Sequence, residues 1–288
     1  MRNINNKTIL ITGGSGFIGH NFIKLLLKKK IKNLKIINID KLTNASIKKS
    51  NLVFKNFKNY KFYKFDISNK KKIDELFHKF KIDIIINFAA ESHVDNSIKE
   101  SFKFIKSNII GTYNLINAAY KNWMQSPHKY KNLYKKSFFL QISTDEVYGS
   151  IKMGKNIDET GKFYPSSPYS ASKAAAEDIV HSFYKTYGLN TLISNSSNNF
   201  GPNQNIEKFI PKVIYSILNN KKIILYGNGK NIRDWIYVDD NCNALIYILK
   251  KGKFGESYNI STNFQFSNKE IILKIISLIS KKVNKKQK

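Results

Sequence analysis

The chain has 288 residues, enough for one large α/β domain or two unequal lobes that share a sheet, and its 42% hydrophobic and 24% charged residues describe a soluble globular protein. The net charge of +29 would suit a nucleic acid or an anionic membrane, but the lysines are spread along the whole chain. Genomic base composition explains this charge at least as well, because lysine, asparagine and isoleucine codons are rich in A and T, so we expect no nucleic acid and no membrane partner.

Strands and helices alternate through the first two thirds of the chain. Apolar runs predict strands at residues 7–12, 34–40, 61–67, 82–90, 137–144 and 190–196. Amphipathic runs predict helices at residues 17–30 and 70–80, within 98–121, and from 168 to about 187. The alternation predicts an α/β fold with a doubly wound parallel sheet of the Rossmann type, which we place at residues 1–196.

Residues 197–288 follow a different pattern. The segments GPNQN, YGNGKN and STNFQFSN are rich in turn-forming residues, so the elements between them must be short. We expect a smaller C-terminal α/β lobe at residues 197–288, lying over the edge of the sheet.

Cysteine content and hydropathy indicate the cellular compartment. The single cysteine, Cys242, excludes an internal disulfide framework and fits a reducing compartment. No apolar run approaches the length of a membrane span, and the N-terminus enters a strand without a signal-peptide segment. We therefore expect a cytoplasmic protein.

The segment ITGGSGFIG places Gly13, Gly16 and Gly19 between the first strand and the first helix. Glycines at this spacing allow a tight turn, a close approach of the backbone to a pyrophosphate, and close packing of helix on strand. Asp40 ends the next strand at the expected distance, where it suits a ribose 2′-hydroxyl and would repel a 2′-phosphate. The pattern favours NAD over NADP as cofactor; the alternative is an ordinary strand–helix turn.

The segment YSASK sets Tyr169 and Lys173 four residues apart at the start of a helix, hence on one face. A neighbouring ammonium and a bound nicotinamide cation would lower the pKa of the phenol and let it act as a base. The alternative is an ordinary surface pair. Together with the glycine-rich turn, the pair points to oxidation of a carbinol.

Thr144, Asp145 and Glu146 follow the strand at 137–144, at the strand end where parallel sheets bind ligands. Adjacent carboxylates repel each other, which raises at least one pKa and allows one group to act as acid while the other acts as base. A polar loop with a helix-capping aspartate is the alternative.

Arginine occurs only at Arg2 and Arg233, although the chain has 49 basic residues. Guanidinium is a planar fork that can bind a phosphate through two hydrogen bonds, which lysine cannot do. Arg233 is therefore a candidate anion-binding residue; a structural ion pair with Asp234 or another acid is the alternative.

Several motifs together carry a resemblance to a known family. They are ITGGSGFIG, DKLT, AAESHVD, NIIGTYNL, ISTDEVYG, PSSPYSASKAAAE, SNNFGPNQ, EKFIP and YGNGKNIRDWIYVDD. With them the chain resembles the dTDP-glucose 4,6-dehydratases of the extended short-chain dehydrogenase/reductase superfamily, from about residue 7 to residue 270. The TDE triplet separates these dehydratases from their sister epimerases and decarboxylases.

The resemblance implies NAD-dependent dehydration of dTDP-glucose to dTDP-4-keto-6-deoxyglucose, for deoxysugars such as rhamnose in cell-surface polysaccharide. The reaction oxidises C4, eliminates water across C5 and C6, and returns the hydride to C6. Tyr169 matches the base at the 4-hydroxyl, with Lys173 beside it, and Thr144 matches the group that hydrogen-bonds this hydroxyl. Glu146 matches the base at C5, and Asp145 matches the acid at the departing 6-hydroxyl.

The resemblance also implies binding residues. For NAD they are Gly13, Gly16, Phe17, Ile18, Gly19, Asp40, Asp66, Ile67, Ala89, Ala90, Tyr169, Lys173 and Asn199. For the sugar nucleotide they are Ser92, Thr144, Asn198, Lys208, Tyr226, Arg233 and Asn268. No metal site is expected. Members of the family generally dimerise through a pair of helices, which implies a homodimer through residues 100–121 and 170–187.

The chain departs from the family pattern in two places. Asn44 and Ser46 replace an aromatic residue and a glycine after DKLT, which predicts a looser adenosine end of the site. Relative to the family the sequence is shortened at the C-terminus, which predicts weaker substrate binding than NAD binding. Two alternatives stay open: a related epimerase or dehydratase for another nucleotide, and an NAD-binding remnant without turnover.

Overall fold

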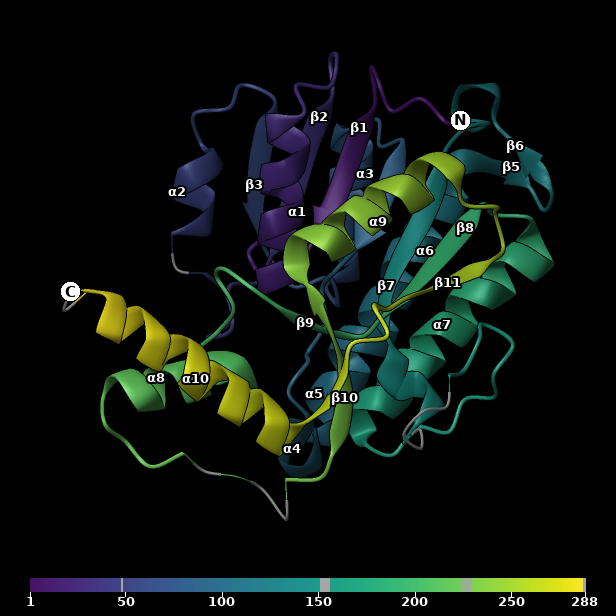
Figure 1. The fold of residues 1–288 in the computed structure, drawn as a ribbon. Coiled ribbons are helices and arrows are strands. Elements are labelled where there is room, and N and C mark those ends of the chain that lie inside the picture. Colours follow the sequence, from purple (N-terminus) through teal and green to yellow (C-terminus); the bar gives the residue numbers. More distant parts are fainter. Residues whose placement is uncertain (48, 151–155, 224, 226–228, 287–288) are drawn as a thin grey trace.

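The computed structural model describes residues 1–47, 49–150, 156–223, 225 and 229–286. Its centre is a seven-stranded parallel sheet in the order β11-β8-β7-β4-β1-β2-β3 (Figure 1). The strands are β1 Thr8–Thr12, β2 Lys35–Asp40, β3 Tyr60–Lys64, β4 Ile84–Asn87, β7 Phe138–Thr144, β8 Thr191–Ser196 and β11 Ser257–Ile260. The strand order changes direction between β1 and β4, the place where doubly wound sheets bind their ligands. The predicted fold class is confirmed.

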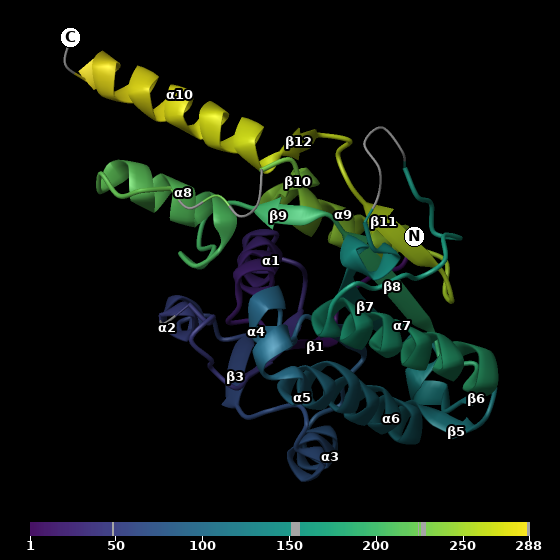
Figure 2. The same cartoon turned by 90° about the horizontal axis from the view of Figure 1, so that it is seen from below.

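Helices cover both faces of this sheet (Figures 1 and 2). The two layers consist of α1 Phe17–Lys28 and α9 Val238–Lys251 on one face, and α3 Lys70–Lys79, α6 Gly111–Trp123 and α7 Pro168–Tyr187 on the other. In β1, Ile9 and Ile11 belong to the core under α1 and α9, while Leu10 belongs to the core under α3, α6 and α7. Both faces of the strand are thus buried, which explains its unbroken apolar sequence.

The long helix expected within residues 98–121 is divided into segments. They are α4 Val94–Lys99, α5 Ser101–Phe104, the π-helix η1 Ile105–Ile110, and α6. A π-turn inserts one extra residue, which changes the face that the following side chains present. Ser107 and Asn108 are buried in η1 as a result, a feature that apolar periodicity alone does not predict.

The remaining short elements flank these layers. They are α2 Ser50–Phe54, the hairpin strands β5 Met124–Ser126 and β6 Lys129–Tyr130, and the 3-10 turns η2 Asn132–Tyr134 and η3 Asp145–Tyr148.

The C-terminal region contributes α9 Val238–Lys251 to one helix layer and β11 to the large sheet, and it also forms a separate small sheet. Its small sheet has the order β12-β10-β9, and its helices α8 and α10 lie beside each other away from the large sheet (Figure 2). Their bounds are β9 Asn198–Phe200, α8 Phe209–Leu218, β10 Ile232–Tyr237, β12 Gln265–Ser267 and α10 Asn268–Lys286. Strand β11 pairs with β8 and α9 packs on α1, so part of residues 197–288 packs with the large sheet. The predicted division at residue 196 therefore remains a proposal about which residues bind the substrate.

Arg2, the other arginine, fastens the N-terminus to the end of α9. Its guanidinium donates hydrogen bonds to the carbonyl oxygens of Leu249 (2.9 Å), Ile248 (3.1 Å) and Gly252. The same group lies 4.4 Å from the ring centre of Phe254. It thus satisfies carbonyls that a helix end leaves unpaired, and it stacks on an aromatic ring at the same time.

We expect Arg2→Lys to lower the free energy of unfolding by about 1–2 kcal/mol, because an ammonium cannot reach three carbonyls and a ring together. Urea unfolding of the variant, beside Lys253→Gln at an exposed neighbouring position, measures this. Equal midpoints for Arg2→Lys and the parent protein would show that the charge alone is sufficient.

Candidate active site

The turn between β1 and α1 brings three segments into close contact. Gly13 has φ +68°, and a Cβ there would lie 2.6 Å from the backbone nitrogen of Ala89, just after β4. A Cβ on Gly19 would lie 2.5 Å from the carbonyl oxygen of Gly13. No side chain caps α1 at Gly16. The N–H groups of the first helical turn are therefore offered to an anion, together with the positive end of the helix dipole.

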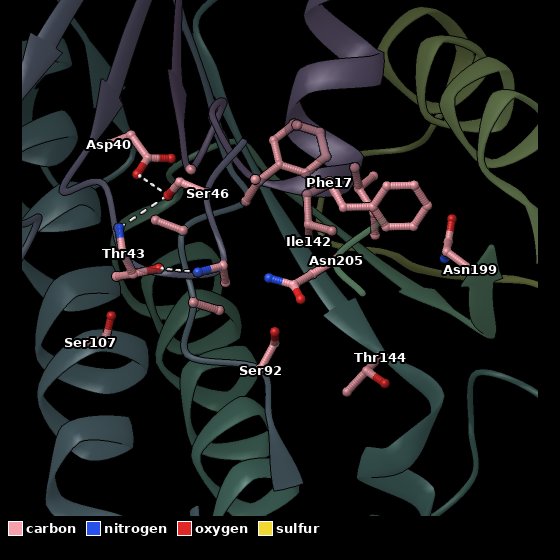
Figure 3. A pocket seen from close by; sticks show the side chains of 18 of the residues that line it. Phe17, Asp40, Thr43, Ser46, Ser92, Ser107, Ile142, Thr144, Asn199 and Asn205 are labelled. Carbon is pink, nitrogen blue, oxygen red and sulfur yellow. Dashed lines mark hydrogen bonds between the residues drawn. The ribbon is translucent and has the colours of Figure 1, made fainter. Parts of the chain in front are cut away.

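Asp40, the last residue of β2, lies beside this turn (Figure 3). Its carboxylate accepts hydrogen bonds from the backbone N–H of Ser15 (3.0 Å) and of Leu42 (2.8 Å), and from the hydroxyl of Ser46 (3.3 Å). Burial raises the pKa of Asp40, and these three donors oppose that effect. Ser46, which departs from the family pattern, thus supplies a contact that holds Asp40 in place.

Lys41, the next residue, is held by two acids from neighbouring loops. Its Nζ lies 2.7 Å from Glu91 Oε1 and 3.5 Å from Asp66 Oδ2. Burial acts to lower the pKa of Lys41, but Glu91 and Asp66 outweigh it and raise the pKa. With its charge balanced in this way, Lys41 is poorly placed to favour a 2′-phosphate, which agrees with the preference for NAD.

A cavity of about 300 Å³ runs from Asp40 and Ser46 at one end to Thr144 and Asn199 at the other (Figure 3). All residues that we predicted to bind NAD line it: Gly13, Gly16, Phe17, Ile18, Gly19, Asp40, Asp66, Ile67, Ala89, Ala90, Tyr169, Lys173 and Asn199. These residues follow or end four strands of the large sheet, β1 to β4, or lie on α1, α7 and the small-sheet strand β9.

The acid pair lies at the end of β7. Thr144 Oγ1 accepts a hydrogen bond from the N–H of Glu146 (3.3 Å) and donates one to Asp145 Oδ1 (3.2 Å). Burial, assisted by the charge of Glu146, raises the pKa of Asp145 to about 7. Burial also raises the pKa of Glu146, but Arg233 and Lys208 oppose this. Burial therefore favours the neutral form of both acids, but Arg233 and Lys208 oppose it at Glu146, which makes Asp145 the better candidate for the protonated member of the pair.

Tyr169 and Lys173 lie one turn apart on α7, with side chains only 8% and 3% exposed. Burial lowers the pKa of Lys173 to about 8, and its Nζ donates a hydrogen bond to the carbonyl oxygen of Ile142 (2.6 Å). Burial, followed by the charge of Glu146, raises the pKa of the Tyr169 phenol. The lowered phenol pKa predicted from the sequence therefore cannot come from Lys173 alone.

A second cavity, of about 540 Å³, is lined by Arg233 and by both acids. Glu146 and Asn198 line both cavities, so the two spaces meet at the acid pair. Within the described chain no carboxylate is within ion-pair distance of Arg233, and Asp234 instead accepts hydrogen bonds from Thr262. The alternative of an ion pair with Asp234 is therefore wrong.

The other residues predicted to bind substrate have different positions. Ser92 and Lys208 line the first cavity, and Lys208 Nζ donates a hydrogen bond to the carbonyl oxygen of Ser92 (2.9 Å). Asn268 begins α10 and is not among the residues that line either cavity; its backbone N–H donates to the carbonyl of Asn231 (3.0 Å). Tyr226 lies outside the described residues.

Asn108, which is not among the residues lining either cavity, supports the site from behind, and the sequence prediction missed it. Its side-chain amide accepts a hydrogen bond from the N–H of Glu91 (2.8 Å) and donates to the carbonyl of the same residue (3.1 Å). It also donates to Ser172 Oγ (2.8 Å), between Tyr169 and Lys173. Asn108 thus joins the loop after β4 to the helix of the Tyr–Lys pair. A polar residue inside the apolar run NIIG was the available signal.

The first cavity fits a dinucleotide. Its glycine turn leaves no room for a Cβ, the start of α1 is uncapped, and Asp40 is positioned for a ribose. Asn199 lines this cavity, and its buried Oδ1 has no hydrogen-bond partner among the described residues, as expected of a group that binds a ligand. The fold and this site define a dinucleotide-dependent enzyme of the extended short-chain dehydrogenase/reductase type.

The chain belongs to the GDP-mannose 4,6 dehydratase family, whose sequence model matches residues 10–288. A curated relative is the dTDP-glucose 4,6-dehydratase of Haemophilus influenzae, which is 40% identical over 272 residues, or 94% of this chain and 79% of the relative.

Two solved structures extend the comparison. One is a dTDP-glucose 4,6-dehydratase from Bacillus anthracis in complex with NAD (TM-score 0.84, 38% identity, 95% of this chain and 81% of that one). The other is a dTDP-glucose 4,6-dehydratase from Streptomyces venezuelae with NAD and TYD bound (TM-score 0.86, 32% identity, 95% and 81%). The resemblance to the dTDP-glucose 4,6-dehydratases is confirmed.

Proposed function

We propose that this protein is a hydro-lyase that converts dTDP-glucose to dTDP-4-keto-6-deoxyglucose with NAD as cofactor. The observation that carries the proposal is the meeting of the two cavities at Glu146, with Asp145 in the second and Tyr169 in the first. A hexose bound at this junction can contact a phenol and two carboxyl groups of different protonation state. Its nucleotide would extend along the second cavity past Arg233.

NAD would be held by the turn from Gly13 to Gly19 at its pyrophosphate and by Asp40 at its adenosine ribose. When bound, NAD supplies the acceptor and the donor of hydride for the reaction. The chain provides the groups that orient the sugar and move its protons.

The first step needs a base at the sugar's 4-hydroxyl. Tyr169 is the candidate because its phenol lines the cavity beside Thr144, whose hydroxyl opposes the rise in the phenol pKa. Lys173, buried one turn away, adds positive charge that favours the phenolate. Oxidation at C4 then makes the proton on C5 more acidic.

The second step removes water across C5 and C6, and it needs a base and an acid at the same time. Glu146 is the candidate base, because Arg233 and Lys208 favour its ionised form. Asp145 is the candidate acid, because its pKa of about 7 keeps about half of it protonated in neutral solution, where an ordinary aspartate is almost fully ionised. The proton taken from C5 and the hydroxyl lost from C6 balance as one water molecule.

Mass spectrometry of the sugar nucleotide after incubation with NAD tests this function. We expect dTDP-glucose, and not UDP-glucose, to lose the mass of one water. A change of configuration without a change of mass would identify the alternative, an epimerase. Bound NAD with no change in either sugar nucleotide would identify the second alternative, a protein that binds NAD without turnover.

Arg233→Lys tests the proposed grip on the diphosphate. We expect the KM for dTDP-glucose to rise about tenfold or more, the equivalent of one lost charge-assisted hydrogen bond, while NAD affinity is unchanged. Calorimetric titration of each ligand separates the two effects. Equal substrate affinity for arginine and lysine would show that only the charge matters at this position.

A homodimer would use the apolar side chains of α4 to α6. Five of them are 41% to 69% exposed: Ile98, Phe102, Ile105, Ile110 and Tyr113. Four of them lie within residues 100–121 of the predicted interface, and Ile98 lies just before it on α4. Helix α6 packs against α7, the second helix of that prediction. Exposed apolar side chains gathered on one helical surface favour burial against a second copy.

Light scattering on Phe102→Lys tests the dimer. We expect the parent protein to have twice the mass of the variant, because a buried unpaired ammonium opposes association. Leu52→Lys, at a similarly exposed position on α2, is the control and should stay dimeric. A monomeric parent protein would contradict the proposal directly.

The compartment is a further part of the proposal. Among the described helices, none combines the length and apolar character needed to cross a bilayer. Cys242 is buried and unpaired, which agrees with a reducing compartment, and we propose the cytoplasm.

A further inference from the structure

Glu177 continues the line of buried polar residues on α7. It follows Lys173 by four residues, as Lys173 follows Tyr169, so the three side chains lie along one face of the helix. The Glu177 side chain is 2% exposed, yet it is an acid, a residue type that is almost never fully buried without a partner. The proposed roles of Tyr169 and Lys173 leave this acid unexplained.

One oxygen of Glu177 joins two strands of the sheet. Its Oε1 accepts hydrogen bonds from Ser143 Oγ and from Asn195 Nδ2 (2.8 Å). Ser143 of β7 and Asn195 of β8 are partners in the sheet register, just before Thr144. Ser143 lines the first cavity and Asn195 lines the second. Glu177 therefore connects the Tyr–Lys helix to the strand end on which both cavities meet.

Glu177 is also electrically coupled to Lys173. Burial lowers the pKa of Lys173 to about 8, and Glu177 is the charged group that raises it again. Burial raises the pKa of Glu177 itself to about 7, with Ser143, Asn195 and Lys173 opposing. With a pKa only slightly above neutral pH, the Lys173 ammonium is mostly but not fully protonated at pH 7. Losing the negative charge of Glu177 would lower this pKa and the protonated fraction further.

Few other titratable groups act on Glu177. On α7 they are Lys173 and the exposed Asp178, and on η3 there is Tyr148, whose pKa the charge of Glu177 helps to raise. The packed strands β7 and β8 contribute the non-titrating Ser143 and Asn195.

We propose that Glu177 is a positioning residue that keeps Lys173 charged and fixes α7 against the ends of β7 and β8. The inference rests on the proposed function, because it acts through the Tyr169 base. A charged Lys173 stabilises the phenolate form of Tyr169, so Glu177 sets the pH range in which C4 is oxidised.

Glu177→Gln separates charge from shape. The amide keeps an oxygen for Ser143 and Asn195, and its nitrogen replaces Oε2, which has no partner among the described residues. We expect an unchanged or raised midpoint of thermal unfolding, because a buried charge is replaced by a neutral group. We expect the pH profile of the C4-oxidation rate to move about one pH unit toward alkaline pH. The rate at neutral pH then falls about tenfold.

Asp178→Asn, which removes the adjacent exposed carboxylate, is the matched control and should leave the profile in place. A Glu177→Gln profile that superimposes on the parent profile would overturn the inference, as would a lowered unfolding midpoint with an unshifted profile. A parent protein that turns over no sugar nucleotide would instead defeat the proposed function.

Infrared difference spectra provide a test without substrate or turnover. The parent protein should show the carbonyl band of a buried protonated carboxyl group that titrates near neutral pH. Asp145, whose pKa is also raised to about 7, contributes to this band, so Asp178→Asn should keep its full amplitude and Glu177→Gln should lose the part that labelled glutamate shifts. If Glu177→Gln does not fold, isotope-edited spectra of the parent protein with labelled glutamate still decide the point. Absence of a glutamate band that titrates near neutrality would overturn the proposed coupling.

Discussion

Asp145→Asn should stop the reaction after sugar oxidation. Asparagine keeps the size of the side chain and can still accept a hydrogen bond from Thr144, but it has no acidic proton for the departing hydroxyl. We expect water elimination to slow about 10²–10⁴-fold, the usual contribution of a general acid, while C4 oxidation and NAD binding persist. Absorbance of the reduced nicotinamide should therefore rise and stay high after the sugar nucleotide is added.

The same experiment has a control and a clear contrary result. Asp239→Asn removes an exposed acid in the first turn of α9 and should show parent-like turnover. Mass spectrometry follows the loss of water in parallel. If Asp145→Asn eliminates water at the parent rate, the acid must be another group, and Glu146 or a water molecule would have to take its place.

Asp145 also predicts a pH dependence. Its pKa is raised to about 7, so the protonated form needed for an acid predominates below pH 7 and is lost as the pH rises through that value. Elimination should therefore slow on the alkaline side, while oxidation by Tyr169 should speed up there. Single-turnover rates measured separately for the two steps should show opposite slopes. Parallel slopes would mean that one group controls both steps.

The sequence predicted the architecture well because the parallel sheet is buried on both faces. A buried strand such as β1 has an unbroken apolar sequence. A glycine-rich turn directly after such a strand indicates a backbone that packs too closely for a Cβ. The residues that line the first cavity follow from the same logic, since the carboxyl ends of parallel strands meet at one edge.

Other features depend on contacts that sequence periodicity does not contain. The π-helix at Ile105–Ile110 buries Asn108 by a local change of hydrogen bonding. Strand β11, at Ser257–Ile260, joins the large sheet although it follows the small-sheet strand β10 in the chain. The resemblance implies that Asn268 binds the substrate, yet it starts a helix and is not among the residues lining either cavity. The first is a change of local hydrogen bonding and the other two depend on tertiary packing, and neither is contained in apolar periodicity.

Tyr169→Phe should block the reaction one step earlier than Asp145→Asn. The ring can stay in place, with its centre 6.3 Å from that of Phe104, while the phenol oxygen that we propose takes the 4-hydroxyl proton is lost. We expect C4 oxidation to slow about 10²–10⁴-fold. Folding should be preserved, because the change removes one oxygen from a buried side chain and adds none.

The two variants together order the chemistry. In Tyr169→Phe no reduced nicotinamide should accumulate, whereas in Asp145→Asn it should, so a single absorbance trace distinguishes a missing base from a missing acid. Tyr164→Phe, at an 81% exposed position, is the control and should behave like the parent protein. Accumulation of reduced nicotinamide at the parent rate in Tyr169→Phe would show that another group deprotonates the 4-hydroxyl. Thr144 would then be the first group to test, because it lines the same cavity.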